Sequence, residues 1–131
     1  TAIHGITDED VAGSHTFEQV APGLNKWLET NDNPALTAAP LESRAAHYLL
    51  EAKREDRTPM DPVARFHLGN GAAVHAVHTG ADTSENGMHQ SGGAMVNYLY
   101  DLSQITTNHE HFVTEKTVTA SPEVRALSAA L

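Results

Sequence analysis

The sequence predicts one domain, residues 1–131, that combines helices with a small sheet and belongs to the α/β or α+β class. Its 131 residues suit one domain of ordinary size, and a hydrophobic content of 40% is enough for a core. Leu41–Arg54 repeats apolar residues at helical spacing, whereas Ala72–His78 and Ala94–Tyr100 have the alternation or the aromatic content of strands. We therefore expect few strands flanked by helices, with three helices before the strands and two after them.

The first part of the chain is expected to alternate loops and helices. Thr1–Ser14 lacks periodicity and is interpreted as a loop or a weakly formed terminal element. Pro22–Leu28 opens with a proline suited to a first helical turn and places its apolar residues on one face, which predicts a short helix. Thr30–Pro40 is rich in Asn, Pro and Ala and predicts a loop. Leu41–Arg54 is then predicted as an amphipathic helix.

The middle of the chain carries clear helix boundary signals. Asp61 followed by proline is typical of an N-cap and a first helical position, so a helix is expected from there to Leu68. Gly69–Gly71 ends that helix, because these residues tolerate positive φ and allow a sharp reversal. The predicted strand Ala72–His78 follows directly.

The last part returns to helices after the second strand. Thr79–Gly93 is polar and contains glycines, which predicts a loop with a short turn at Ser84–His89 capped by Asp82. Beyond the strand, a helix is expected over Gln104–Glu115. A final helix is predicted to open at Ser121, which precedes a proline and a glutamate.

Composition excludes several classes of protein. With 8 Lys plus Arg against 17 Asp plus Glu, the formal charge is −9, so we expect no general nucleic-acid binding. The absence of Cys excludes disulfides, a cysteine nucleophile and thiolate metal sites. No apolar run approaches the ~20 residues of a membrane span, and no basic-then-apolar leader follows Thr1. We expect a cytoplasmic protein without a membrane partner.

His67 is the leading candidate for chemistry. It lies in the last turn of a predicted helix, immediately before a Gly-Asn-Gly reversal that exposes backbone amides and leaves room for a ligand. The structural alternative is that His67 packs beside Phe66 and donates one hydrogen bond to a carbonyl. These residues alone do not name a reaction.

Other clusters predict no metal site or nucleophile. Strict alternation would put His75 and His78 on opposite faces of their strand, and we expect His109 and His111 to lie on an exposed helix. A triad with His67 would draw its nucleophile and acid from the segment that holds Ser84, Ser91 and Asp82, but the Gly-x-Ser-x-Gly motif is missing. We predict that Ser91 and the two glycines after it form a turn.

Asn97 and Tyr98 lie in the middle of the predicted second strand. An amide and a phenol on opposite faces require that at least one of them has a buried partner or faces a cleft. Structural hydrogen bonding is the alternative to a role in lining a site.

Several ordered motifs resemble the C-terminal part of malonyl-CoA decarboxylase. They are FHLGNGA, the Asp-x-Ser pair, MVNYLYDL and the Ser-x-x-Val-x-x-Leu ending, and together they span roughly residues 41–127. The segment PGLNKWL is similar to the family's PGF-x-x-WL, and residues 1–20 match only weakly.

The resemblance implies conversion of malonyl-CoA to acetyl-CoA and carbon dioxide, without metal or organic cofactor because CoA is part of the substrate. It also implies a partial GNAT-like acyltransferase fold. His67 matches the family's catalytic His, the expected proton donor. We expect Asn70 and Gly71 to shape the turn beside it, and Asn97 and Tyr98 to line the substrate site.

The chain departs from the family pattern at a second catalytic position. Where the family has a Ser ahead of the Trp-Leu pair, Gln19 or Ala21 stands here, depending on the placement of a gap. The family's upstream Gln- and Gly-rich segment and its helical N-terminal domain have no counterpart. The hypotheses are a decarboxylase completed by a second copy or another chain, a fragment of a longer protein, and a non-catalytic module that binds an acyl-CoA or a partner.

Overall fold

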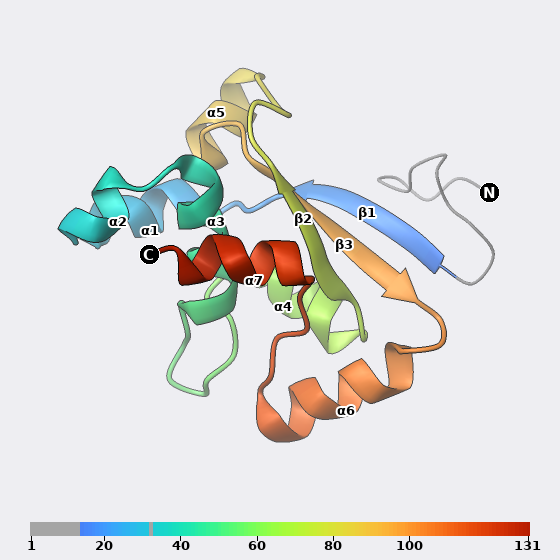
Figure 1. Ribbon diagram of the computed structural model, residues 1–131. Coiled ribbons are helices and arrows are strands. Elements are labelled where there is room, and N and C mark those ends of the chain that lie inside the picture. Colours follow the sequence, from blue (N-terminus) through green and yellow to red (C-terminus); the bar gives the residue numbers. More distant parts are fainter. Residues whose placement is uncertain (1–13, 32) are drawn as a thin grey trace.

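The computed structural model describes residues 14–31 and 33–131 and has an α+β fold, as the sequence predicts. Of the segment predicted as a terminal loop, residues 1–13 lie outside this described part. Three strands and seven helices occur within it (Figure 1): β1 Ser14–Val20, α1 Leu24–Thr30, α2 Pro34–Ala38, α3 Leu41–Glu51, α4 Pro62–Gly69, β2 Ala73–His78, α5 Glu85–Ser91, β3 Met95–Asp101, α6 Ile105–Glu115 and α7 Pro122–Ala129.

The sheet is antiparallel, with β3 between β1 and β2. The sequence did not predict β1. Its polar residues hide the strand pattern, and the segment becomes a strand by pairing with β3, about 80 residues away, where Phe17 stands opposite Tyr98 and Gln19 opposite Val96. This register puts Phe17 and Gln19 on the same face of the sheet as Tyr98.

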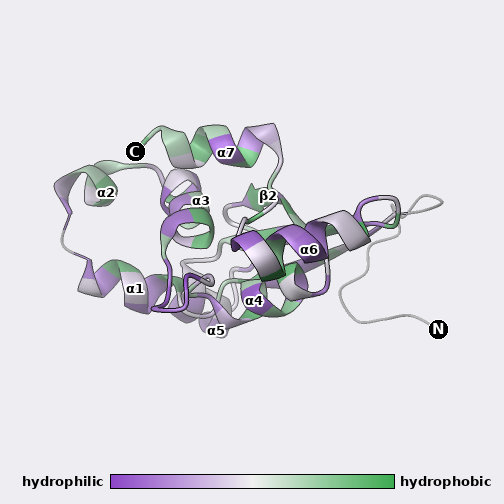
Figure 2. Cartoon of the chain, turned by 90° about the horizontal axis from the view of Figure 1, so that it is seen from below, coloured by the Kyte–Doolittle hydropathy of each residue, from purple (hydrophilic) through white to green (hydrophobic). Residues whose placement is uncertain are grey.

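The core lies between this face of the sheet and the helices. The strand residues Val74, Val96 and Tyr98 are 0% exposed. In α3, Tyr48 and Leu49 are at most 1% exposed. In Figure 2, α7 lies beside α3 and α4 lies near α6, and the same helix pairs are in contact. The amphipathic stripe predicted for α3 is therefore confirmed as a core-facing surface.

Two loop predictions were wrong. The stretch predicted as loop Thr30–Pro40 contains α2, because the Asn33 side chain accepts a hydrogen bond from the N–H of Ala35 and a proline fills the first helical position. The turn predicted at Ser84–His89 is the helix α5. Its N-cap is Ser84, which accepts from Gly87, whereas Asp82 accepts from the N–H of Ser84.

The predicted alternation along β2 was also wrong. The pairing with β3 shifts between Val74 and Ala76, which marks a β-bulge at His75. As a result Val74 and Val77, which strict alternation would put on opposite faces, both lie on the core face and are buried, while His75 and His78 are both exposed.

Among the described helices, none combines the length and the apolar character needed to span a membrane. The partial GNAT-like arrangement stays a prediction, since three antiparallel strands do not define it.

Candidate active site

The helix α4 holds His67 in place from both ends. At its start the Asp61 side chain accepts a hydrogen bond from the N–H of Ala64 at 3.0 Å, the N-cap that the sequence predicts. At its end the N–H of Asn70 donates to the carbonyl of His67 at 3.1 Å, and Gly71 turns the chain with φ of 91°. His67 therefore lies in the last turn of a helix that is capped at both ends.

Asp61 also ties α4 to two other elements. It is 0% exposed, and its Oδ1 accepts from the Tyr48 hydroxyl of α3 at 3.2 Å and from the Gly23 N–H at 3.5 Å. Burial is the main cause that raises the pKa of Asp61, and the hydrogen bonds it accepts oppose that rise. Burial followed by the nearby Asp61 carboxylate raises the pKa of Tyr48.

The imidazole of His67 is enclosed between rings and hydrogen-bonded at both nitrogens. It is 2% exposed and stacks on Tyr98, with ring centroids 4.4 Å apart and an angle of 21° between the planes. Its Nδ1 lies 2.6 Å from the Tyr100 hydroxyl of β3, and its Nε2 lies 2.6 Å from Oε1 of Gln19 in β1. Both hydrogen bonds are short for their type.

The charge state of His67 follows from this enclosure. Burial disfavours the charged imidazolium and lowers the pKa of His67 from 6.5 to about 4. At neutral pH the ring is therefore neutral and carries one N–H, with the second nitrogen free to accept a hydrogen bond. Nε2 faces the Gln19 carboxamide oxygen, which can only accept a hydrogen bond, and Nδ1 faces the Tyr100 hydroxyl, which can donate or accept one.

The four predicted lining residues take different places. Tyr98 lies flat against the His67 ring. Asn70 is the C-cap of α4 and donates from its side chain to the Phe66 carbonyl at 3.0 Å. Asn97 projects from the opposite face of β3, so the structure does not bring it to His67.

Gly71 has a packing role in this structure. A Cβ at Gly71 would lie 2.5 Å from the carbonyl oxygen of Ile105, and its own carbonyl accepts from Asn108 at 3.1 Å. Gly71 thus fixes the close approach of the turn to α6.

Three side chains around the imidazole were missed or only partly predicted from the sequence. Tyr100 and Phe17 were not considered, although alternation places Tyr100 on the same face of β3 as Tyr98. Gln19 was one of two candidates for the family's Ser position. The structure puts Gln19 against His67, whereas Ala21 is 1% exposed within the core.

The remaining candidate clusters form no reactive site among residues 14–31 and 33–131. No group of three or more His, Asp or Glu there could hold a metal ion. The Ser91 hydroxyl is buried and donates to the carbonyl of Ala94 at 2.7 Å, so it supports the turn before β3. Asn97 Oδ1 and the Tyr98 hydroxyl are buried without a hydrogen-bond partner.

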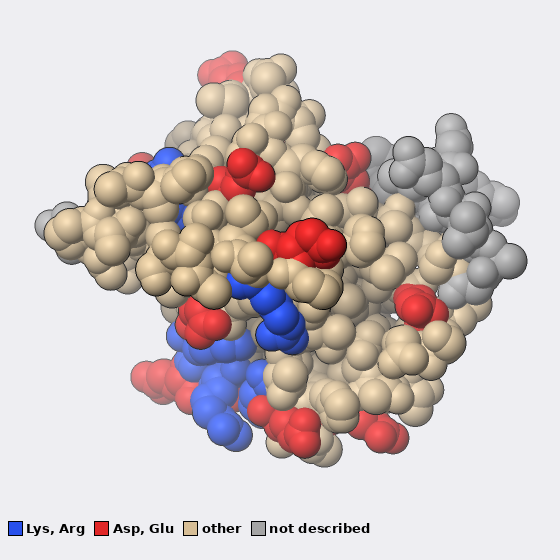
Figure 3. Space-filling model, in the orientation of Figure 1, with Lys and Arg blue, Asp and Glu red and all other residues tan. Residues whose placement is uncertain are grey.

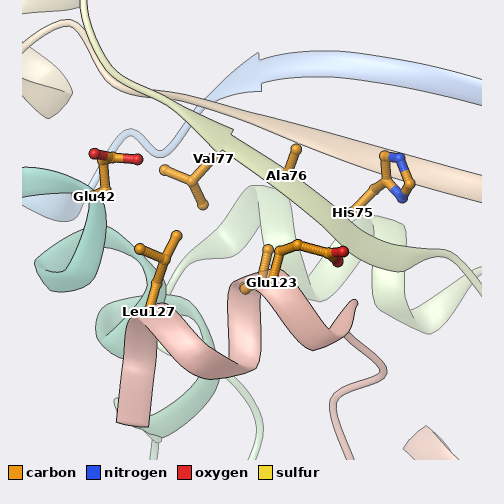
Figure 4. A pocket seen from close by; sticks show the side chains of 7 residues that line it. Glu42, His75, Ala76, Val77, Glu123 and Leu127 are labelled. Carbon is orange, nitrogen blue, oxygen red and sulfur yellow. The ribbon is translucent and has the colours of Figure 1, made fainter. Parts of the chain in front are cut away.

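Several cavities in the described part of the chain lie away from His67. Figure 4 shows one of about 480 Å³ between β2, α3 and α7, with Glu42, His75 and Glu123 at its wall. His67 lines neither this cavity nor four others of about 260 to 540 Å³. Because His67 is 2% exposed and Gln19 Oε1 lies 2.6 Å from Nε2, access to Nε2 requires a neighbouring side chain to move.

Charge is distributed unevenly over the face seen in Figure 3. Lys and Arg side chains gather over the loop between α3 and α4, whereas Asp and Glu side chains are spread widely. A cavity of about 540 Å³ there is bordered by two basic residues, two acidic residues and a methionine: Lys53, Arg54, Glu55, Asp56 and Met60. This loop leads directly into α4, which carries His67.

Comparison with known proteins gives a consistent result over most of the chain. The sequence model of the family described as malonyl-CoA decarboxylase C-terminal domain matches residues 6–130. The mitochondrial malonyl-CoA decarboxylase of Mus musculus is 33% identical over 121 residues, which are 91% of this chain and 24% of the mouse protein. The chain thus spans about a quarter of the length of this curated relative.

Solved structures show the same similarity. Malonyl-CoA decarboxylase from Rhodopseudomonas palustris aligns with a TM-score of 0.78 and 36% identity, covering 86% of this chain and 34% of the other. The Agrobacterium vitis enzyme of the same name aligns with a TM-score of 0.76 and 33% identity, over 86% and 35% of the two chains. Sequence and fold therefore agree.

Proposed function

The chain belongs to the malonyl-CoA decarboxylase family, and from this premise we propose that it binds malonyl-CoA and decarboxylates it at His67. The observation that supports this most is the imidazole held between the Tyr100 hydroxyl and the Gln19 carboxamide oxygen, with each ring nitrogen 2.6 Å from its partner. We propose that the thioester oxygen of the substrate takes the place of the Gln19 oxygen when that side chain swings away.

In the proposed reaction, the bond between the substrate's central carbon and its carboxylate breaks. The electron pair of that bond passes into the thioester enolate as carbon dioxide leaves. The N–H of His67 first donates to the enolate oxygen and then gives its proton to carbon, and solvent returns a proton to the ring. No metal or organic cofactor takes part in this proposal.

A neutral imidazole suits the donation of a hydrogen bond to the enolate oxygen. With its pKa lowered to about 4, His67 stays uncharged at pH 7, so its N–H acts as an electrophilic hydrogen-bond donor. Its enclosure by Tyr98 and Phe17 keeps the surroundings weakly polar, which strengthens a hydrogen bond to a developing oxyanion.

A second candidate function is binding of an acyl-CoA without turnover. Two observations favour it: Gln19 offers a carboxamide where the family resemblance expects a hydroxyl, and His67 is only 2% exposed. Loss of one acid–base or oxyanion group typically reduces the rate by ~10²–10⁴-fold. Completion of the site by a second copy or another chain, and a cytoplasmic location, remain predictions.

The test combines calorimetric titration with malonyl-CoA and an assay of acetyl-CoA formation. We expect binding and a slow turnover that His67→Ala abolishes, while His78→Ala, an exposed histidine of β2, leaves turnover unchanged. Binding without product would instead support the second function. Failure to bind malonyl-CoA would contradict both.

A further inference from the structure

Tyr100 meets the His67 ring at the nitrogen opposite the one directed at Gln19. Its hydroxyl lies 2.6 Å from Nδ1, and β3 presents it on the same face as Tyr98. We infer that Tyr100 is a positioning residue: its O–H donates to Nδ1 and thereby holds the proton of the neutral imidazole on Nε2.

The donor and acceptor inventory of the ring supports this direction. A neutral imidazole has one donor and one acceptor nitrogen. Because the Gln19 atom at 2.6 Å from Nε2 is a carboxamide oxygen, it accepts and Nε2 donates. Nδ1 is then the acceptor, and the Tyr100 O–H is the group that donates to it.

Asn70, at the end of α4, influences the Tyr100 hydroxyl. A side-chain hydrogen bond from Asn70 acts to lower the pKa of Tyr100, against the larger effect of burial, which raises it. In this inference the hydrogen bonds run in one direction, from Tyr100 through His67 to Gln19.

Packing shields this hydrogen-bond series from water. The Phe17 ring lies 5.4 Å from the His67 ring and 5.3 Å from the Tyr100 ring, between centroids, and meets Tyr100 edge-on. His67 is covered on another side by Tyr98. With little competing water, each ring nitrogen depends on its protein partner for its hydrogen bond.

The catalytic consequence rests on the proposed function, whereas the tautomer itself does not. In the other tautomer, Nε2 would present a lone pair to the Gln19 oxygen and to the substrate oxygen proposed to replace it. The lone pairs on nitrogen and oxygen would then repel each other. Tyr100 would then support the reaction without touching the reacting atoms, which predicts an effect on kcat larger than on KM.

The test is ¹⁵N NMR of the histidine ring nitrogens at pH 7, which distinguishes a protonated nitrogen from an unprotonated one. In the unaltered chain we expect His67 protonated at Nε2. In Tyr100→Phe we expect the proportion with Nδ1 protonated to rise about fivefold to tenfold, the equilibrium factor of one ordinary hydrogen bond. Circular dichroism checks that the variant is folded.

Tyr98→Phe is the matched control. It removes the same group from a ring that also touches His67, but the Tyr98 hydroxyl has no hydrogen-bond partner, so the tautomer ratio should not change. Protonation at Nδ1 in the unaltered chain would overturn the inference, as would an equal response of the two variants. The first measurement decides this even if Tyr100→Phe does not fold.

Kinetics separates this inference from the proposed function. If the chain turns over malonyl-CoA, Tyr100→Phe should lower kcat at least tenfold with KM little changed, and an unchanged kcat would refute the catalytic role. If no turnover occurs in any variant, the proposed function fails while the tautomer result still decides the role of Tyr100 in positioning.

Discussion

Acidification should destabilise this fold through His67. Burial lowers the pKa of His67 from 6.5 to about 4, so the folded chain binds a proton there less readily than the unfolded chain does. The stability that His67 contributes is therefore fully present above pH 6.5, falls between pH 6.5 and about 4, and does not fall further below that range. Each pKa unit is worth about 1.4 kcal/mol, which gives a loss of about 3 kcal/mol.

The magnitude needs little reduction for solvent screening, because the His67 side chain is 2% exposed. Its ring contacts are also with groups that do not change charge between pH 4 and 7: the Gln19 amide and the rings of Tyr98, Tyr100, Phe17 and Phe66. The loss should therefore belong to the imidazole itself.

The assay is urea unfolding of the unaltered chain and of His67→Gln at a series of pH values. The difference between their free energies of unfolding cancels the contributions of other titrating groups. We expect this difference to be constant above pH 7 and to shift by about 3 kcal/mol against the unaltered chain by pH 4. Parallel pH curves for the two proteins would refute the assignment.

Three stability predictions follow from the elements around His67. Asp61→Ala should lower the free energy of unfolding in urea by about 3 kcal/mol, because it removes the α4 cap and leaves buried donors unpaired. Asp61→Asn should lower it less. A loss below about 1 kcal/mol for Asp61→Ala would be inconsistent with this reasoning. Gly71→Ala should lower the free energy of unfolding by more than about 2 kcal/mol, because the added Cβ would meet Ile105. Gly80 has a φ of 65° but open space around it, so Gly80→Ala should lower the free energy of unfolding by only about 1 kcal/mol. Equal losses in the two variants would contradict the packing role of Gly71. Tyr98→Phe should leave the free energy of unfolding unchanged or raise it by up to about 1 kcal/mol, since the lost hydroxyl is buried and unpartnered. A loss above about 2 kcal/mol would disprove this.

Helices with local end signals were predictable from the sequence. Asp61 and Ser121 cap α4 and α7 through their side chains, as their positions before Pro62 and Pro122 indicate. Such caps depend on neighbours within four residues, so no knowledge of the fold is needed. α3 likewise follows from its own periodicity.

Features that depend on distant pairing were not predictable in this way. β1 exists through its partner β3, and the bulge at His75 is a local departure from alternation that the residue types do not mark. The contacts of Gln19 and Tyr100 with His67 need both the sheet register and the placement of α4. The sequence therefore indicated the imidazole but only part of what surrounds it.

The role of His67 in malonyl-CoA chemistry can be measured most directly in a background where its partner is a hydroxyl. We expect Gln19→Ser to form acetyl-CoA from malonyl-CoA at least ~10² times faster than the Gln19→Ser, His67→Ala double variant. Equal rates in the two variants would show that this imidazole delivers no proton to the substrate.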